Sequence, residues 1–413
     1  MPGAYHDELN DIDQIRDNLR DRYKSGFPVL KEIIQNADDA GATHLTMGWT
    51  DGLPMADHPL LSEPALFFIN NAPLRDKDAI AIRSIAMGAK ADSKTAVGKF
   101  GLGMKSLFHF GELYFFLAND WRIDSVKAEV FNPWGDSYRP QWDRFTDSDK
   151  EAIEHHLSDM LAQLAGDASL VVWVPIRSIS KLDGIEPIVK SNDYQTSVPD
   201  FLIDPMLQNQ VARLIPLLKH LNQIDLYLIT GGNPQSSFSV AMTPESGRIA
   251  YGRDSDQPVW GGQIQIANSR SAETDSIHFA GTEVLLTDQP FSDLRNHPKW
   301  PSSFGRGAEG SQKERVIEDK TDAHAASVLL RKKTDSQAML SIQWAVFLPL
   351  GEQDTQEQNQ RWTMEIEGGF DYELLLHGYF FVDAGRVGIH GRLHLGKSTS
   401  LEISDDTDLT MEW

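Results

Sequence analysis

Residues 28–41 read PVLKEIIQNADDAG, and this stretch has the features of one amphipathic helix. Pro28 stands near the start and Gly41 just past the end, which are the positions that proline and glycine favour in helices. At about 100° per residue, one arc of the predicted helix is apolar and is expected to face the core. That arc consists of Val29, Leu30, Ile33, Ile34, Ala37 and Ala40. The opposite arc is expected to face solvent and consists of Lys31, Gln35 and Asp38.

A polar stripe lies between these two arcs. Glu32, Asn36 and Asp39 are spaced i, i+4 and i+7, which places them in line along the predicted helix. Two acids and an amide at the edge of a core can line the wall of a pocket. From this segment alone, an ordinary amphipathic surface helix is an equally good interpretation.

A glycine-rich motif follows downstream, where residues 97–110 read VGKFGLGMKSLFHF. Gly98, Gly101 and Gly103 have the spacing G-x-x-G-x-G and lead directly into an apolar segment that is compatible with a helix. Glycine lets backbone N–H groups approach a ligand closely, and a helix N-terminus adds unpaired donors and a positive dipole end. The motif is therefore typical of phosphate binding. Alone it is weak evidence, and the polar stripe upstream strengthens it.

Together these motifs resemble the GHKL (Bergerat-fold) ATPases, which include gyrase B, MutL, histidine kinases and the ninety-kilodalton heat-shock chaperones. Within this superfamily the chain resembles the sacsin-type ATP-binding domain. The resemblance rests on residues 34–40, 66–71 and 98–109, within roughly the first third of the chain. Weaker similarity continues at residues 169–177, 217–221 and 376–380.

The resemblance implies a site for ATP and Mg²⁺. Asn36 would help to coordinate the metal, and Glu32 would orient or deprotonate the attacking water. A lid over the triphosphate is expected at residues 88–96. The residues expected to contact the nucleotide are Asn36, Asp39, Asn70, Asn71, Lys90, Gly98, Lys99, Phe100, Gly101, Leu102, Gly103, Lys105 and Ser106. For the lysines, solvated loop positions are an equal alternative.

The end of strand 66–69 departs from the family pattern. Most GHKL proteins have Asp-x-Gly-x-Gly there, and the Asp accepts a hydrogen bond from the adenine amino group. Here both candidate positions, Asn70 and Asn71, are asparagines, whose amides donate as well as accept. Leu170 also stands where relatives often carry a Thr near the adenine, with Ser169 beside it. Base selectivity is therefore expected to be looser than in relatives that keep the Asp.

Other nucleotide motifs fit less well. Gly98 and Gly103 have P-loop spacing, but Met104 stands where the lysine belongs and Lys105 where the Ser or Thr belongs. A histidine kinase would place a His-bearing dimerisation helix before the ATP domain, and only a short sequence precedes Glu32. A nucleotide-binding scaffold with negligible hydrolysis remains an alternative to the ATPase. His109 and the pair His155–His156 do not form a metal-ligand pattern.

The composition excludes several classes of protein. The chain has 413 residues, no cysteine and a formal net charge of −22. Disulfides and thiolate metal sites are therefore excluded, and a broad nucleic-acid-binding face is not expected. No apolar run approaches the ~20 residues of a membrane span, and the N-terminus is polar and acidic. A cytoplasmic protein without a membrane segment is expected.

The predicted fold class is α+β. Residues 1–180 are expected to form a two-layer α/β sandwich, with a mixed sheet covered by helices on one face. Residues 181–200 read as a linker, and residues 201–413 as a second α+β, middle-like domain with a mobile loop near 292–321. The spacing of apolar residues predicts helices at 8–24, 150–164 and 203–223.

The predicted activity is slow, Mg²⁺-dependent ATP hydrolysis that drives lid closure and a conformational or dimerisation switch, in a chaperone-like or defence-related role. The resemblance implies a nucleotide-dependent homodimer or a larger assembly, formed through residues 1–24. Arg386 is a weaker candidate for a sensor of the γ-phosphate. The sequence names no client or partner protein.

Overall fold

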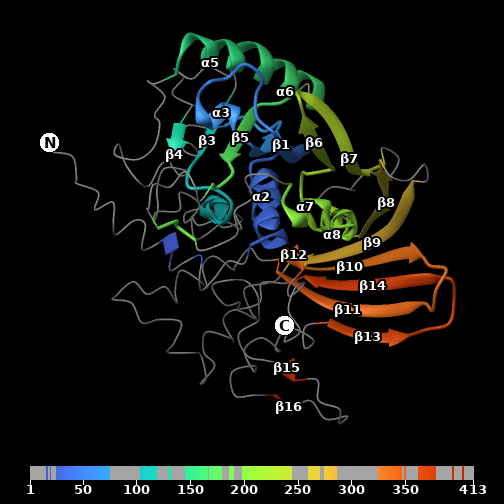
Figure 1. Ribbon diagram of the computed structural model, residues 1–413. Coiled ribbons are helices and arrows are strands. Elements are labelled where there is room, and N and C mark those ends of the chain that lie inside the picture. Colours follow the sequence, from blue (N-terminus) through green and yellow to red (C-terminus); the bar gives the residue numbers. More distant parts are fainter. Residues whose placement is uncertain are drawn as a thin grey trace. The chain divides into compact units, whose positions relative to one another are not determined.

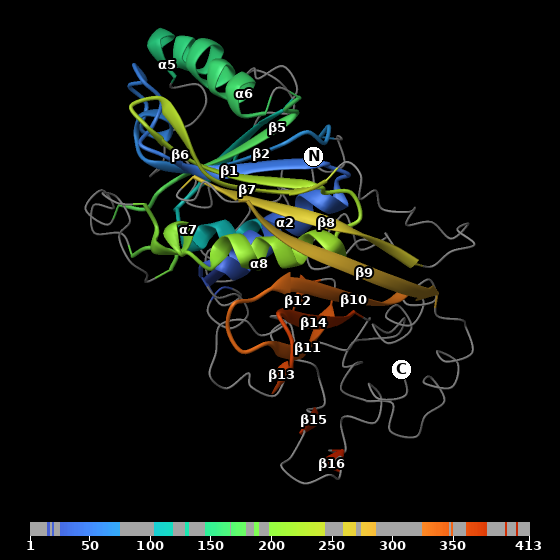
Figure 2. The ribbon, with the colours of Figure 1, turned by 90° about the vertical axis from the view of Figure 1, so that its right-hand side faces the viewer.

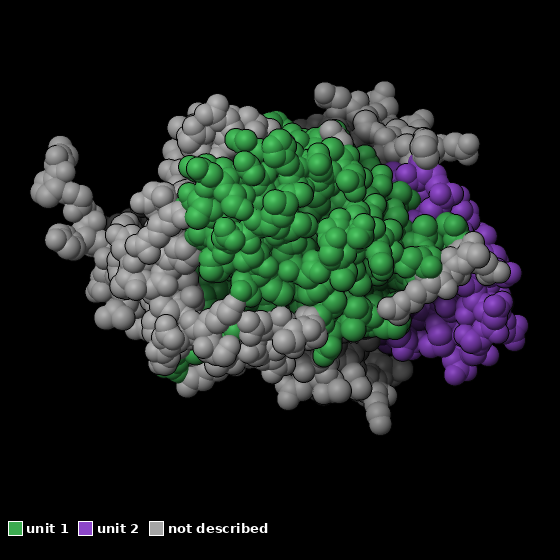
Figure 3. Space-filling view, turned by 45° about the horizontal axis from the view of Figure 1, so that its top comes forward, with its two compact units in different colours: residues 1–91, 98–241, 266–275 green, residues 92–97, 242–265, 276–413 purple. Residues whose placement is uncertain are grey.

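The computed structural model describes part of the chain. The described residues are 15–16, 19, 25–74, 103–118, 129–131, 145–165, 167–178, 186–189, 198–243, 259–269, 274–285, 324–346, 348–349, 361–377, 393–394 and 402–403. The chain divides into two compact units (Figure 3). Unit 1 comprises residues 1–91, 98–241 and 266–275, and unit 2 comprises residues 92–97, 242–265 and 276–413.

Unit 1 is built on a mixed sheet. Its strands are β1 (His44–Thr50), β2 (Ala65–Asn70), β3 (Tyr114–Ala118), β4 (Glu129–Phe131), β5 (Leu170–Pro175), β6 (Gln223–Thr230) and β7 (Asn233–Met242). They lie in the order β7-β6-β1-β2-β5-β3-β4 (Figure 1). β1 and β6 are parallel, and the other neighbours are antiparallel. The mixed α+β class is as predicted.

Helices lie on both faces of this sheet (Figure 2). One face carries α5 (Asp147–Glu151), the π-helical turn η5 (Ala152–Leu157) and α6 (Ser158–Leu164). The other face carries α2 (Phe27–Asp39), α7 (Asp200–Ile203) and α8 (Leu207–Leu214). The short helices α3 (Pro59–Ser62), η2 (Gly103–His109) and η7 (Ile215–Leu217) complete the helical elements described in unit 1. The predicted two-layer sandwich with helices on one face is therefore not confirmed.

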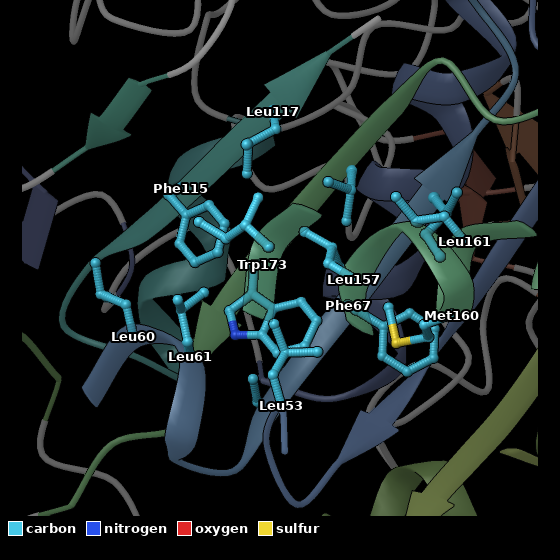
Figure 4. Close-up of a cluster of buried hydrophobic side chains, with 14 of the residues drawn as sticks. Leu53, Leu60, Leu61, Phe67, Phe115, Leu117, Leu157, Met160, Leu161 and Trp173 are labelled. Atoms are coloured by element: carbon cyan, nitrogen blue, oxygen red, sulfur yellow. The ribbon is translucent and has the colours of Figure 1, made fainter. Parts of the chain in front are cut away.

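The core on the α5–α6 face is centred on an indole ring. Trp173 of β5 lies opposite Phe67 of β2 and Phe115 of β3 in the strand register. The ring centroids are 6.5 and 6.1 Å from that of Trp173, and both pairs are stacked. Leucines and Met160 from α3, η5 and α6 close over these rings (Figure 4). Burial of such large apolar side chains stabilises this face of the sheet.

Two predicted helices differ from the observed ones. The helix predicted at 203–223 is divided into α7, α8 and η7, because Pro205 and Pro216 interrupt its hydrogen bonding. The helix predicted at 150–164 begins earlier, at Asp147, where Thr146 and Asp149 form a capping box. It also passes through the wider π turn of η5.

Unit 2 consists of strands in its described residues. They are β8 (Val259–Asn268, shared with unit 1), β9 (Asp275–Leu285), β10 (His324–Lys333), β11 (Met339–Val346), β12 (Leu348–Pro349), β13 (Arg361–Glu365), β14 (Phe370–His377), β15 (Leu393–His394) and β16 (Glu402–Ile403). The order β9-β10-β14-β11 is continued by β12 and β13, which pair with different parts of β11. β11 and β14 are parallel. A second α+β domain is not confirmed, since no helix is described here.

Several predictions concern residues outside the described ranges. Residues 292–321 and most of 8–24 lie outside the described residues. Unit 1 extends past residue 180 because β6 pairs with β1. The domain limits 1–180 and 201–413 stay a prediction. Within the described ranges, none of the helices has the length and apolar character that crossing a membrane requires.

Candidate functional site

Helix α2 carries the predicted polar stripe. It spans Phe27–Asp39, and Gly41 follows it with a φ of 88°, a left-handed conformation that glycine adopts without strain. Most of the predicted core arc is buried, but Ala40 lies past the helix end and is exposed. The helix therefore forms as the sequence predicts, shifted by one residue toward the N-terminus.

The solvent-facing arc was predicted wrongly at two positions, since Gln35 and Asp38 are buried. The Asp38 carboxylate accepts hydrogen bonds from the backbone N–H groups of Lys219, His220 and Leu221, at 2.9, 2.7 and 2.9 Å. Asp38 thus holds the end of α2 against the turn that leads into β6.

The stripe itself lies where it was predicted, at the boundary of the core. Glu32, Asn36 and Asp39 are all half-buried. Their helix packs against η2, the segment that begins at Gly103 of the glycine motif. The fold therefore places the helix that carries the stripe against the segment that continues the glycine motif, within unit 1.

η2 is a buried 3₁₀ segment. Lys105 and Ser106 are 2% and 0% exposed. The Lys105 Nζ lies 3.9 Å from the ring centroid of Phe131 in β4. Burial lowers the pKa of the Lys105 ammonium to about 7, because a charge is poorly solvated there. The alternative of a solvated loop position for Lys105 is therefore wrong, and its contact with a nucleotide stays a prediction.

Arg177, at the end of β5, holds the C-terminal end of η2. Its guanidinium donates to the carbonyls of Phe108, His109 and Gly111. It also pairs with Glu112, with 2.5 Å between Nε and Oε1. The carbonyl groups at the C-terminal end of a helix lack donors within the helix, and the guanidinium supplies N–H donors to them.

The end of β2 contains the two asparagines. The Asn70 Oδ1 accepts from the Ala72 N–H at 3.0 Å, an Asx-type turn. Asn70 lies opposite Leu170 in the β2–β5 register, and its carbonyl accepts from the Ser169 N–H at 2.8 Å. The residues expected near the base are thus neighbours in the sheet.

Asn71 ties two segments together instead. Its Oδ1 accepts from the N–H groups of Thr43 and His44, at 2.9 and 3.2 Å. Its Nδ2 donates to the Thr43 Oγ1 at 2.7 Å and to Asp167 at 2.8 Å. The Asn71 oxygen therefore already accepts two hydrogen bonds, the full capacity of an amide carbonyl.

Part of the predicted site is outside the described residues. This applies to the lid at 88–96 and to Arg386, and also to Lys90, Gly98, Lys99, Phe100, Gly101 and Leu102. Among the described residues, no three His, Cys, Asp or Glu side chains come together as metal ligands. His109 is buried in η2.

Sequence reasoning missed Asp38, Arg177 and Glu112 as structural residues. Helical periodicity predicts that Asp38 lies on the outer side of α2. It gives no information about the contact of Asp38 with the turn at 219–221. The pairing of Arg177 with Glu112 joins residues far apart in the chain. The weaker family similarity at 169–177 and 217–221 was the only feature of the sequence that pointed to the segments containing Arg177 and the partners of Asp38.

Two comparisons with known proteins bear on this site. The family model described as the Sacsin domain matches residues 10–240, which is more than half of the chain. The human protein Sacsin is 34% identical over 166 residues. That match covers 38% of this chain and 3% of the human protein, so the chain corresponds to a small part of that relative. The matched residues include α2, η2 and the ends of β2 and β5.

Proposed function

The chain belongs to the Sacsin domain family, and we propose that it binds Mg·ATP in unit 1 and hydrolyses it slowly, in a chaperone-related role. The observation that carries this proposal is the packing of α2 against η2. The helix with Glu32, Asn36 and Asp39 thereby adjoins the segment that continues the glycine motif.

The residues of the stripe fit a magnesium ion and a nucleotide chemically. Mg²⁺ prefers oxygen ligands and is usually held by one or two protein groups, with phosphates and waters completing its shell. The Asn36 side-chain oxygen would be such a ligand, and the stripe is half-buried, which would limit competition by solvent. When bound, the metal would offset the charge of the phosphates. The backbone N–H groups at Gly103 and beyond would complete the phosphate site that begins at Gly98.

In this proposal Glu32 acts on water and Asn36 acts on the metal. Both lie on the same stripe of α2, four residues apart, so the helix holds them in a fixed relation. Glu32 would orient the attacking water or take its proton. Positioning and charge stabilisation, more than covalent chemistry, would carry the reaction.

The test compares Glu32→Ala with Asn36→Ala. We expect Asn36→Ala to weaken Mg·ATP binding in isothermal titration, because the metal links the protein to the phosphates. Glu32→Ala should leave binding nearly intact and should lower phosphate release by roughly 10²–10⁴-fold, the range for loss of a general base. Lys31→Ala on the same helix is the matched control and should change neither measurement. A Glu32→Ala protein that hydrolyses ATP at the wild-type rate would contradict the proposal.

A second candidate is a scaffold that binds nucleotide without appreciable hydrolysis. The hydrogen bonds of Asn71 favour it in one respect, since the Asn71 oxygen already accepts two hydrogen bonds within the protein. Glu32 favours hydrolysis. Steady-state phosphate release by the wild-type protein separates the two candidates, because a scaffold would bind nucleotide and release no phosphate above background.

The conformational output of the proposed ATPase is lid closure and association. We expect the lid at 88–96 to become protected from limited proteolysis when a non-hydrolysable ATP analogue is added. Two copies, or a larger assembly, would then form through residues 1–24. Sedimentation with and without nucleotide should show a larger species with nucleotide than without it.

A further inference from the structure

β13 is an outer strand of unit 2. Its residues Arg361–Glu365 pair with Gln343–Met339 of β11 on one side (Figure 1). In the described part of the chain, no strand pairs with its other side. An outer strand presents backbone N–H and C=O groups that can pair with another chain.

The hydrogen-bond pattern shows which groups of β13 face outward. The Ile366 N–H donates to the Ala338 carbonyl at 2.9 Å, and these residues are opposite each other in the register. Because hydrogen-bonded and non-hydrogen-bonded pairs alternate in antiparallel strands, residues 364 and 362 also direct their backbone groups to β11. Residues 361, 363 and 365 therefore direct theirs away from the sheet.

One face of the same sheet is largely apolar and partly exposed. Leu329, Leu374, Ile342 and Trp362 form one cross-strand row, and Arg331, Tyr372, Leu340 and Met364 form the next. Leu329, Trp362 and Met364 are 38%, 40% and 42% exposed. The opposite face is buried at Val328, Leu330, Ser341, Gln343 and Leu375. Large exposed side chains gathered in rows of this kind mark an interaction surface.

The sequence of β13 indicates what this edge binds. It reads Arg-Trp-Thr-Met-Glu, so its charges are opposite at the two ends and its two large apolar residues flank the centre. A strand of this pattern is complementary to itself when reversed. We propose that β13 pairs with β13 of a second copy of this chain, antiparallel, with Thr363 on the two-fold axis.

In this register every backbone N–H and C=O group that β13 directs away from β11 has a hydrogen-bond partner. Thr363 exchanges two backbone hydrogen bonds with its counterpart, and residues 361 and 365 form the same kind of pair with their opposites. Residue 361, an arginine, stands opposite residue 365 of the second copy, a glutamate. Trp362 stands opposite Met364 of the second copy in a non-hydrogen-bonded pair, where side chains are closest. The interface is isologous and closes as a dimer.

This dimer differs from the nucleotide-dependent association proposed above. It uses unit 2 and none of the residues of the nucleotide site, so it should form with or without nucleotide. A five-residue strand pair with a few apolar contacts is a small interface, so we expect a dissociation constant on the order of 10⁻⁵ M.

The charge pattern allows a sharp test by sedimentation equilibrium without nucleotide. Arg361→Glu places two glutamates opposite each other at both ends of the pair, and Glu365→Arg places two arginines there. Each variant alone should dimerise at least about tenfold more weakly than the wild type. An equimolar mixture of the two should form heterodimers, because every opposed pair is then of opposite charge. The double variant, with the charges exchanged, should dimerise like the wild type.

A backbone test uses Thr363. Because its N–H faces away from β11, Thr363→Pro leaves the fold of the sheet intact and removes a central donor of the dimer. It should be monomeric, whereas Thr363→Val, which keeps the N–H, should dimerise. A wild-type protein that is monomeric at about 100 µM, or variants whose mixture does not associate, would overturn the proposal. So would dimerisation of Thr363→Pro at the wild-type strength.

Discussion

Arg177 and Glu112 form an ion pair in the interior of unit 1, with 2.5 Å between Nε and Oε1 and both side chains almost completely buried. The carboxylate also accepts from the backbone N–H of Ile188. The pair thus joins the end of η2, the end of β5 and the segment at 186–189. It fixes the segment that follows the glycine motif.

Removal of either partner should destabilise the protein strongly. Arg177→Met leaves the Glu112 carboxylate buried without its cation and exposes three backbone carbonyls to an apolar environment. We expect a loss of about 3–5 kcal/mol in the free energy of unfolding, measured by urea denaturation. Arg177→Lys should recover little, since an ammonium cannot reproduce the forked contacts of a guanidinium.

The exposed pair of Lys150 and Asp147 is the control for this prediction. Its atoms are 3.4 Å apart, and both side chains are more than half exposed. Because solvent screens such pairs, Lys150→Met should leave the urea midpoint unchanged. A similar loss in Arg177→Met and Lys150→Met would mean that burial of the Arg177 pair has no energetic consequence.

Asp38 and Asp39 are adjacent, but their substitutions should have different effects. Asp38→Ala removes the acceptor of three backbone N–H groups, of which that of Leu221 is buried, and should cost about 2 kcal/mol of stability. Asp39→Ala should cost less and should instead weaken nucleotide binding, since Asp39 lies on the polar stripe. Thermal denaturation and nucleotide titration of both variants check this. The reverse assignment of effects would contradict the structural role of Asp38.

Substitutions of Asn70 and Asn71 should also have different effects. The Asn70 oxygen accepts one hydrogen bond among the described residues and has one lone pair left, whereas that of Asn71 accepts two. Asn70→Ala should therefore change the ratio of ATP to GTP affinity with little loss of stability. Asn71→Ala should cost about 1–2 kcal/mol of stability, because it breaks the tie to Thr43 and Asp167. Competition binding and urea denaturation distinguish them. An unchanged ATP to GTP ratio in Asn70→Ala would remove Asn70 from base recognition.

Lys105 should give stability a pH dependence above neutrality. Burial lowers its pKa from 10.5 in the unfolded chain to about 7 in the folded protein. Between these values the unfolded chain binds more protons, so the contribution of Lys105 to stability rises with pH from about 7 upward. Lys105→Met removes this contribution and should be more stable than the wild type at pH 7 by about 1 kcal/mol or more. The urea midpoint of both proteins, compared from pH 7 to pH 9, measures the difference. A constant difference across that range would contradict the burial effect.

Local sequence patterns predicted the elements that carry the site. Helix 28–41 and the strands around 66–69 and 170–176 were recognisable from short-range periodicity and composition, and α2, β2 and β5 occupy nearly those ranges. The helices on both faces were not predicted. The signal was present, since Leu66–Ile69 is apolar at consecutive positions, as in a strand covered on both sides.

The parts of the site that local sequence patterns did not predict depend on contacts between residues far apart in the chain. Three consecutive N–H groups at 219–221 turn Asp38 from a surface residue into a buried one. Phe131 determines the surroundings of Lys105 from a strand 26 positions further along the chain. Neither contact produces a periodic pattern in the sequence. The glycines before Gly103 and the lid stay predictions, because they lie outside the described residues.

The parallel pairing of β1 with β6 has a consequence for the newly synthesised chain. β1 comprises residues 44–50, whereas its neighbour β6 leaves the ribosome only after residue 230 has been translated. Until then β1 has an open, apolar edge that can pair with other nascent chains. A fragment ending at residue 180 would keep this edge permanently and should aggregate. The shortest fragment suited to nucleotide binding in solution therefore extends beyond β6, and synthesis of unit 1 should depend on protection of that edge while translation continues.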